Sequence, residues 1–200
     1  MLASRTAVDF SRMNLPNQLT VARFGLTLLF AASLASAWRY ANTAGLVLFV
    51  AAGVTDYLDG EIARRRNLVS DFGKLMDPLA DKVMMAAAFI LLVPEGAFPA
   101  WVAVVIVSRE FAITGLRLLA AHKGVVLPAE KLGKHKMVWQ IVAVVFFLLL
   151  LSAREIFWVG PWWRDAWKFG GPVVMTAAVG LTLYSGVGYL WKNRALIAPA

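Results

Sequence analysis

Four aspartates are spaced in a way that could bind metal ions and act on a phosphate group. Asp56 and Asp59 are three residues apart, and Asp77 and Asp81 are four residues apart, so each pair would share one face of a helix. A short basic segment separates the pairs, which makes the two helices antiparallel neighbours and lets the four carboxylates converge. Such a cluster is stable when cations lie within it, and Mg²⁺ and Mn²⁺ prefer oxygen ligands. We therefore predict two divalent ions that could clamp a phosphoryl group.

Small residues lie on the same two predicted faces. Gly60 and Ala63 follow the first aspartate pair, and Gly73 precedes the second pair by one helical turn. Without bulky side chains there, a nucleotide and its phosphates could lie against the backbone, and Arg64 would add a cation for phosphate oxygens. The alternative is that the aspartates only cap helices or pair with the arginines at 64–66.

A second group of charged residues lies in and beside another apolar segment. Arg109, Glu110 and Arg117 fall inside a predicted membrane span, where ionisable groups are usually functional. Glu110 and Arg117 are seven residues apart and share a helical face, so we expect them to pair; the alternative is an ion pair with a structural role only. Together with Lys134, the two arginines would form a cationic pocket beside the metal site. Such a pocket suits an acceptor that carries a phosphate.

The composition indicates that these groups are held by helices in a membrane. The chain is 60% hydrophobic and 16% charged, whereas soluble domains are about 45–50% apolar and about 25% charged. A membrane-spanning helix needs about 20 apolar residues. The candidate spans are residues 19–37, 41–58, 79–93, 100–121, 137–151 and 171–191. We predict an all-α integral membrane protein with six transmembrane helices in one catalytic domain, residues 14–195.

Charge distribution predicts the orientation in the membrane. The net charge is +8, but the basic residues flank apolar runs, which favours lipid over nucleic acid as the partner. Most lysines and arginines fall on one side of the predicted bundle, which is therefore predicted to be cytoplasmic. The same side would hold the four aspartates and both termini, with residues 1–13 as an N-terminal lead. Lys131 and Lys136 belong to the cationic pocket or serve only this topological signal. The tryptophan-rich segment 154–168 is predicted to be an anchor at the opposite interface.

Pro78 interrupts the second aspartate pair. Proline removes a backbone donor and clashes with the preceding turn inside a helix. Either the helix starts near Met76, which places Pro78 in its first turn, or the helix kinks there.

The pattern Asp56-x2-Asp59-Gly60-x2-Ala63-Arg64-x8-Gly73-x3-Asp77-x3-Asp81 resembles the signature of the CDP-alcohol phosphotransferase family at every fixed position. The resemblance implies the six-helix fold of that family and a homodimer. It also implies that all four aspartates are metal ligands and that Asp81 is, in addition, the base that deprotonates the acceptor hydroxyl. The small residues and Arg64 would contact the CDP group.

Further stretches, at 14–23, 77–82, 109–117 and 132–136, resemble a bacterial branch of this family, the phosphatidylglycerophosphate synthases. This implies CDP-diacylglycerol as donor, sn-glycerol 3-phosphate as acceptor, release of CMP, and a place in the bacterial inner membrane. Asn17 and Thr20 would help to hold the nucleotide; the alternative is that they cap the first helix. Within the family, a cardiolipin, phosphatidylserine or phosphatidylinositol-phosphate synthase is the alternative, and outside it a divalent-cation transporter.

Overall fold

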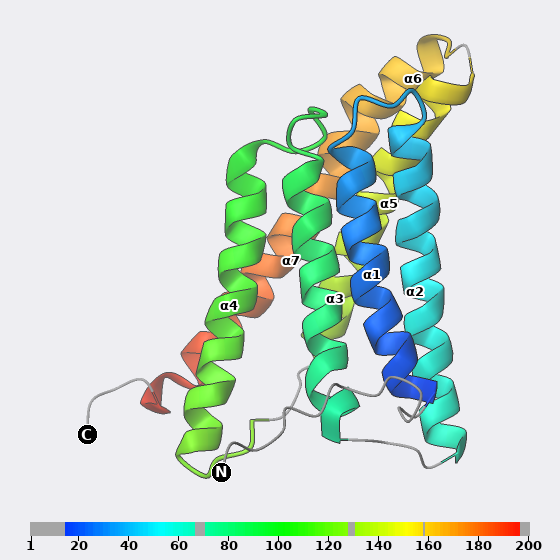
Figure 1. Cartoon of the computed structure of the whole chain (residues 1–200). Coiled ribbons are helices and arrows are strands. Elements are labelled where there is room, and N and C mark those ends of the chain that lie inside the picture. The colour runs from blue at the N-terminus through cyan, green and yellow to red at the C-terminus, as the bar shows by residue number, and fades with distance from the viewer. Residues whose placement is uncertain (1–14, 67–70, 128–130, 158, 197–200) are drawn as a thin grey trace, which may run out of the picture.

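Every secondary-structure element in the part of the chain that the computed structural model describes is a helix, and the long helices lie side by side (Figure 1). The described residues are 15–66, 71–127, 131–157 and 159–196. Within them, only the backbone is described at residues 15–19, 58–66, 71–75, 131, 132, 134 and 196. The predicted lead at 1–13 lies outside this range.

Six long helices of 20–26 residues form the bundle in the described part of the chain. They are α1 (Leu15–Leu34), α2 (Ala41–Arg66), α3 (Asp71–Leu91), α4 (Ala100–His122), α5 (Lys131–Ile156) and α7 (Gly171–Lys192). The short α6 (Pro161–Asp165) and the π-helical turn η2 (Ala166–Gly170) lead into α7, and η3 (Arg194–Leu196) follows it. Successive long helices alternate in direction (Figure 1). We call the end where α2 stops the Arg66 end, and the end where α2 starts the Ala41 end.

Aromatic rings fill the core toward the Ala41 end. Phe98, which lies between α3 and α4, has its ring centroid 4.8 Å from that of Phe89 and 4.8 Å from that of Phe147. All three side chains are buried. The Phe147 ring in turn meets Trp167 edge to face at 5.1 Å, a geometry that aromatic pairs favour. This cluster joins α3, α5 and η2 into one packed unit.

The tryptophan-rich segment, which the sequence predicts to be an interfacial anchor, makes contacts within the protein. Trp163 donates a hydrogen bond to the carbonyl of Leu150 at 2.7 Å and stacks on Trp167. Trp162 is 55% exposed, and its role as an anchor stays a prediction. Two of the tryptophans therefore pack on the protein itself, because α6 folds back over the end of α5.

A carboxylate fastens two helices together at the Ala41 end. Glu155, near the end of α5, accepts hydrogen bonds from the backbone N–H groups of Asn42 and Thr43, both at 2.8 Å. It also accepts from their side chains, at 2.9 Å and 2.6 Å. The first N–H groups of a helix lack partners within that helix, and its N-terminus favours negative charge. Glu155 thus caps α2 from a neighbouring helix.

We expect Glu155→Ala to lower the stability of the protein by about 1–3 kcal/mol, because the N–H groups at the start of α2 lose their acceptor. Thermal unfolding of the detergent-solubilised protein measures the loss. Glu95→Ala is the matched control, since Glu95 lies at the same end, between α3 and α4. Equal melting temperatures for the two variants would contradict this role.

Two helices in the described part are long and apolar enough to cross a membrane, His135–Ile156 and Pro161–Lys192, and Thr20–Leu34 is a shorter apolar helix. The predicted count of six spans is not confirmed by this measure. Helix α4 carries Arg109, Glu110 and Arg117, which interrupt its apolar stretch. The described side chains omit the Arg66 ends of α1, α2 and α3, so this measure covers only part of each of these helices.

Pro78 lies inside α3, well past its first residue, Asp71. The prediction that places Pro78 in the first turn of a helix starting near Met76 is therefore wrong. Helical hydrogen bonding extends through the polar residues before Pro78, which hydropathy alone does not reveal.

Candidate active site

Three of the four predicted aspartates meet one face of α1. The hydroxyl Oγ1 of Thr20 donates to Oδ1 of Asp77 at 2.5 Å. The guanidinium of Arg23 contacts Asp56 through Nη2 at 2.9 Å and Asp81 through Nη1 at 3.1 Å. Asp56 comes from α2 and Asp77 and Asp81 come from α3, so the two predicted aspartate helices do converge, with α1 beside them.

The face of α1 that receives these carboxylates is polar and buried. Thr20, Arg23 and Thr27 are 1%, 1% and 4% exposed, and their spacing places them on one side of the helix. The Thr27 hydroxyl donates to the carbonyl of Arg23 at 2.9 Å. Because Thr20 and Asn17 both lie after the helix start at Leu15, the alternative in which they cap this helix is wrong.

The donor set suits a hard divalent cation. Asp56 and Asp81 are partly exposed, with 41% and 28% of their side-chain surfaces accessible, and carboxylate oxygens are the ligands that Mg²⁺ and Mn²⁺ prefer. Among the described side chains, no three His, Asp or Glu groups form a ready metal centre. The fourth predicted ligand, Asp59, lies outside the described side chains, and Arg23 supplies the positive charge between Asp56 and Asp81.

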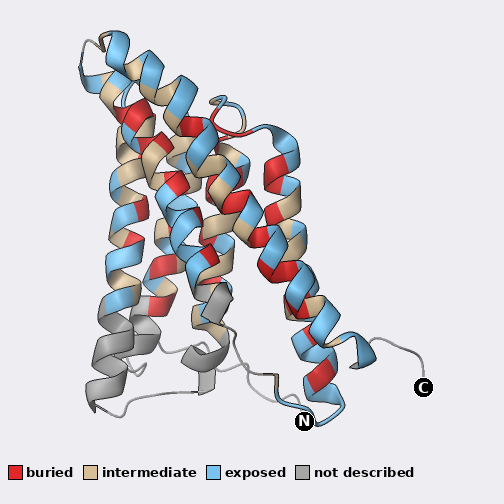
Figure 2. Ribbon diagram, turned by 180° about the vertical axis from the view of Figure 1, so that it is seen from behind, coloured by how far each residue is buried: buried red, intermediate tan, exposed pale blue. Residues whose placement is uncertain are grey.

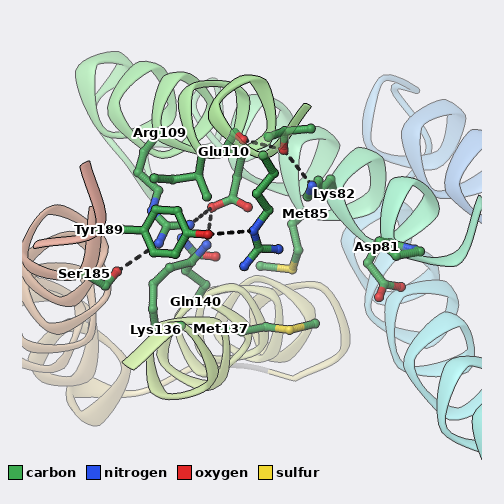
Figure 3. Close-up of a pocket in the computed structure, with 15 residues that line it drawn as sticks. Asp81, Lys82, Met85, Arg109, Glu110, Lys136, Met137, Gln140, Ser185 and Tyr189 are labelled. Atoms are coloured by element: carbon green, nitrogen blue, oxygen red, sulfur yellow. Dashed lines mark hydrogen bonds and ion pairs between the residues drawn. The ribbon is translucent and has the colours of Figure 1, made fainter. Parts of the chain in front are cut away.

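A cavity of about 290 Å³ lies next to this cluster, between α3, α4, α5 and α7 (Figure 3). Asp81 borders it on one side, and Arg109, Arg117 and Lys136 border it on the other. Four cationic side chains line the cavity against two carboxylates: Lys82, Arg109, Arg117 and Lys136 against Asp81 and Glu110. The excess of positive charge makes it suited to an anion.

Glu110 holds two of these cations. Its carboxylate accepts a hydrogen bond from Nη1 of Arg109 at 3.0 Å and contacts Nζ of Lys136 closely. Lys136 is only 5% exposed, so its role is not limited to a topological signal. The predicted pairing of Glu110 with Arg117 is wrong, because residues seven apart lie two turns apart along the axis and Lys136 reaches Glu110 from the adjacent α5.

Helix α7 holds the arginines from the far side of the cavity. Nη2 of Arg109 donates to Oγ of Ser185 at 3.2 Å. Nε of Arg117 donates to the hydroxyl of Tyr189 at 3.2 Å, and its guanidinium lies 5.5 Å from the centre of that ring. The last helix therefore contributes to a pocket that the sequence assigns to α4 and α5 alone.

A second, smaller cavity of about 140 Å³ lies on the other side of Asp81. Arg23 and Asp56 form its polar part, and Phe49, Met84 and Ile141 are among the apolar residues that line it. Asp81 borders both cavities, and so do Met85 and Met137. A single carboxylate thus stands between a cationic chamber and a chamber that is mainly apolar.

Several predicted site residues fall where only the backbone is described. They lie in α1, α2, α3 and α5: Asn17, Asp59, Gly60, Ala63, Arg64, Gly73 and Lys134. Sequence reasoning missed Arg23, Ser185 and Tyr189 as members of the site and left the role of Lys136 open. A charge in an apolar segment could have revealed Arg23, whereas Ser185 and Tyr189 carry no distinctive signal.

The chain matches known proteins over most of its length. The CDP-alcohol phosphatidyltransferase family model matches residues 13–184. A CDP-diacylglycerol–glycerol-3-phosphate 3-phosphatidyltransferase of Bacillus subtilis is 45% identical over 192 residues, covering 90% of this chain and 95% of that protein. A protein of the same name from Rickettsia bellii is 32% identical, covering 88% of this chain and 93% of that protein. A probable phosphatidylglycerophosphate synthase of Mycobacterium tuberculosis is 37% identical, covering 88% and 80% respectively.

These matches and the convergence of aspartates from α2 and α3 agree with the signature found in the sequence. The chain belongs to the CDP-alcohol phosphatidyltransferase family.

Proposed function

We propose that this protein transfers the phosphatidyl group of CDP-diacylglycerol to sn-glycerol 3-phosphate, which gives phosphatidylglycerophosphate and CMP. The observation that carries the proposal is the position of Asp81 between two chambers of different character. The cationic chamber suits a phosphorylated acceptor. The mainly apolar chamber suits the part of a lipid donor that lies next to its phosphates. The relatives named above carry this reaction in their names.

On the donor side, carboxylates from two helices would hold two divalent ions, Mg²⁺ or Mn²⁺. The proposed ligands are Asp56, Asp59, Asp77 and Asp81. When bound, such ions supply positive charge to the pyrophosphate. The CDP group would lie along the small residues of α2 and α3, near the start of α1. Its proposed contacts are Asn17, Thr20, Gly60, Ala63, Arg64 and Gly73.

On the acceptor side, Arg109, Arg117 and Lys134 would bind the phosphate of glycerol 3-phosphate. Lys136 joins this set, since it is buried in the same cavity. The Glu110 carboxylate orients Arg109 and Lys136 through its ion pairs with both side chains. Arginine binds phosphate with two parallel hydrogen bonds, which fixes the acceptor's orientation as well as its position.

Chemistry then needs one proton transfer and one displacement. Asp81 takes the proton of the acceptor's 1-hydroxyl, and that oxygen bonds to the β-phosphorus of the donor. The bond from this phosphorus to the bridging oxygen breaks, and CMP leaves with the electron pair. Arg64 would stabilise the charge on CMP. Positioning and electrostatics supply most of the acceleration in such a reaction.

The membrane arrangement is proposed from the outer surface of the bundle. Each of the six long helices exposes a large apolar side chain: Leu28, Val47, Ile90, Val104, Leu149 and Val187 are 52–72% exposed. Figure 2 shows such exposed positions alternating with buried ones along the helices. A soluble protein would not favour so much exposed apolar surface. We propose six spans in a bacterial inner membrane, with both termini and the site at the cytoplasmic side, and a homodimer as the working unit.

Acceptor-dependent release of CMP by the purified protein tests the function. We expect CMP release from CDP-diacylglycerol with glycerol 3-phosphate, its loss in EDTA, and its recovery when Mg²⁺ or Mn²⁺ is added. Removal of the metal leaves the carboxylates without the charge that holds the pyrophosphate. Activity that is indifferent to EDTA would contradict the metal assignment.

The same assay separates the alternatives. Phosphatidylglycerol, serine or inositol phosphate as the preferred acceptor would indicate another member of the family. Metal flux into vesicles without any lipid substrate would indicate a divalent-cation transporter. The described aspartates disfavour the transporter, since they gather on one helix pair, whereas a transporter would need ligands on several helices near the middle of the membrane.

A further inference from the structure

Gly186 of α7 lies directly against the side chain of Arg109. A methyl group at position 186 would lie 2.9 Å from Cγ and 3.3 Å from Nε of Arg109, which is closer than van der Waals contact allows. The side chain of Arg109 therefore passes over α7 only because residue 186 has no side chain. Gly188, on the same helix, has nothing within 4 Å of the equivalent position among the described atoms.

Contacts on the same side of α7 fix both arginines of the cationic chamber. Ser185 accepts from Nη2 of Arg109, and Tyr189, one turn further on, accepts from Nε of Arg117 and places its ring near the guanidinium. Figure 3 shows Ser185 and Tyr189 on the α7 side of the chamber and Asp81 across it. The Nε of Arg109 is buried and has no hydrogen-bond partner among the described residues. The guanidinium of Arg109 is thus oriented through its two terminal nitrogens, which donate to Glu110 and Ser185.

We infer that α7 positions the acceptor-binding arginines, with Gly186 setting the position of Arg109 and Tyr189 setting that of Arg117. This inference rests on the proposed function. The two arginines determine how far the acceptor phosphate lies from Asp81, and a shift of about 1 Å can cost about 100-fold in rate. Gly186 and Tyr189 are positioning residues, since they act through the arginines. Both also lie beyond residues 13–184, which the family model matches.

The principal test compares Gly186→Ala with Gly188→Ala. Both changes replace glycine by alanine in the same helix, so their effects on helix propensity are alike. We expect Gly186→Ala to raise the KM for glycerol 3-phosphate by about 10- to 100-fold and to leave the KM for CDP-diacylglycerol unchanged. Gly188→Ala should keep both values. A merely structural defect would alter both KM values, and that result, or equal behaviour of the two variants, would overturn the inference.

A double-mutant cycle identifies the group through which Gly186 acts. In an Arg109→Ala background the side-chain atoms that crowd position 186 are gone. Gly186→Ala should then have no further effect on the residual rate. An effect as large as in the wild-type background would show that Gly186 does not act through Arg109.

Tyr189→Phe keeps the inference testable if Gly186→Ala does not fold. It removes only the hydroxyl that accepts from Arg117, and Tyr184→Phe is its control, since Tyr184 is 69% exposed on the same helix. We expect a several-fold rise in the KM for glycerol 3-phosphate for Tyr189→Phe alone. Unchanged kinetics would contradict the role of Tyr189. If the wild-type protein releases no CMP with glycerol 3-phosphate, the proposed function itself fails, which is a separate outcome.

Discussion

Asp81→Asn is expected to fold and to transfer at about a thousandth of the wild-type rate or less. Asparagine keeps an oxygen that can accept from Nη1 of Arg23, which now donates to Asp81 at 3.1 Å, so the contact between α1 and α3 survives. The amide cannot take a proton from the acceptor hydroxyl, and loss of a general base alone costs about 10²- to 10⁴-fold. The negative charge that would help to bind a metal ion is lost as well. CMP release at saturating substrate measures the rate, and thermal unfolding checks the fold.

Asp165→Asn provides the control for this change. Asp165 is exposed on α6, at the Ala41 end and away from both chambers. The same chemical change there should leave transfer intact. Near-normal transfer by the Asp81→Asn protein would remove Asp81 from the mechanism, whatever the other aspartates do.

Arg23→Gln is expected to have the largest effect on stability. Arg23 is 1% exposed and joins Asp56 of α2 to Asp81 of α3 through two ion pairs. Removing one partner of a fully buried ion pair typically costs about 3–5 kcal/mol; the loss here should be smaller than that, because Asp56 and Asp81 are partly exposed and water screens their charge. Here two carboxylates would face each other without the cation between them. Thermal unfolding in EDTA should show the full loss.

Added Mg²⁺ should recover part of the stability of the Arg23→Gln protein, since a divalent cation can replace the missing charge between the carboxylates. Arg39→Gln, at an exposed position near the Ala41 end, is the control. It should lose no stability in EDTA and gain none from added Mg²⁺. If the Arg23→Gln and Arg39→Gln proteins have the same melting temperature in EDTA, the ion pairs of Arg23 do not stabilise the packing of α1, α2 and α3.

The sequence predicts the fold where a structural feature depends on residues that are close together in the chain. The spacing of the aspartates predicts two helical faces, and both stretches are helical in α2 and α3. Hydropathy finds the apolar middle of each helix but not its polar ends. The predicted segment 41–58 therefore stops short of Arg66, and 79–93 begins after Asp71, since backbone hydrogen bonding continues through residues that hydropathy scores as polar.

The site is harder to predict where it depends on contacts between distant residues. Arg23 meets Asp81 across 58 positions of sequence, and an arginine in an apolar segment does not indicate which carboxylate it will meet. Glu110 had an apparent partner on its own helix, in Arg117, but the packing of α5 brings Lys136 closer. Tyr189 could be assigned no role before α7 was placed against α4. These contacts are determined by helix packing, which local sequence patterns do not encode.

The hydrogen bonds between Glu155 and the start of α2 have a consequence for repeated catalytic turnover. It lies at the Ala41 end, where the aromatic rings also pack, and none of these groups borders either chamber. Substrates and products can therefore enter and leave at every catalytic cycle without loosening the contacts at the Ala41 end. These contacts maintain the architecture independently of turnover, whereas the ion pairs of Arg23 belong both to the architecture and to the site.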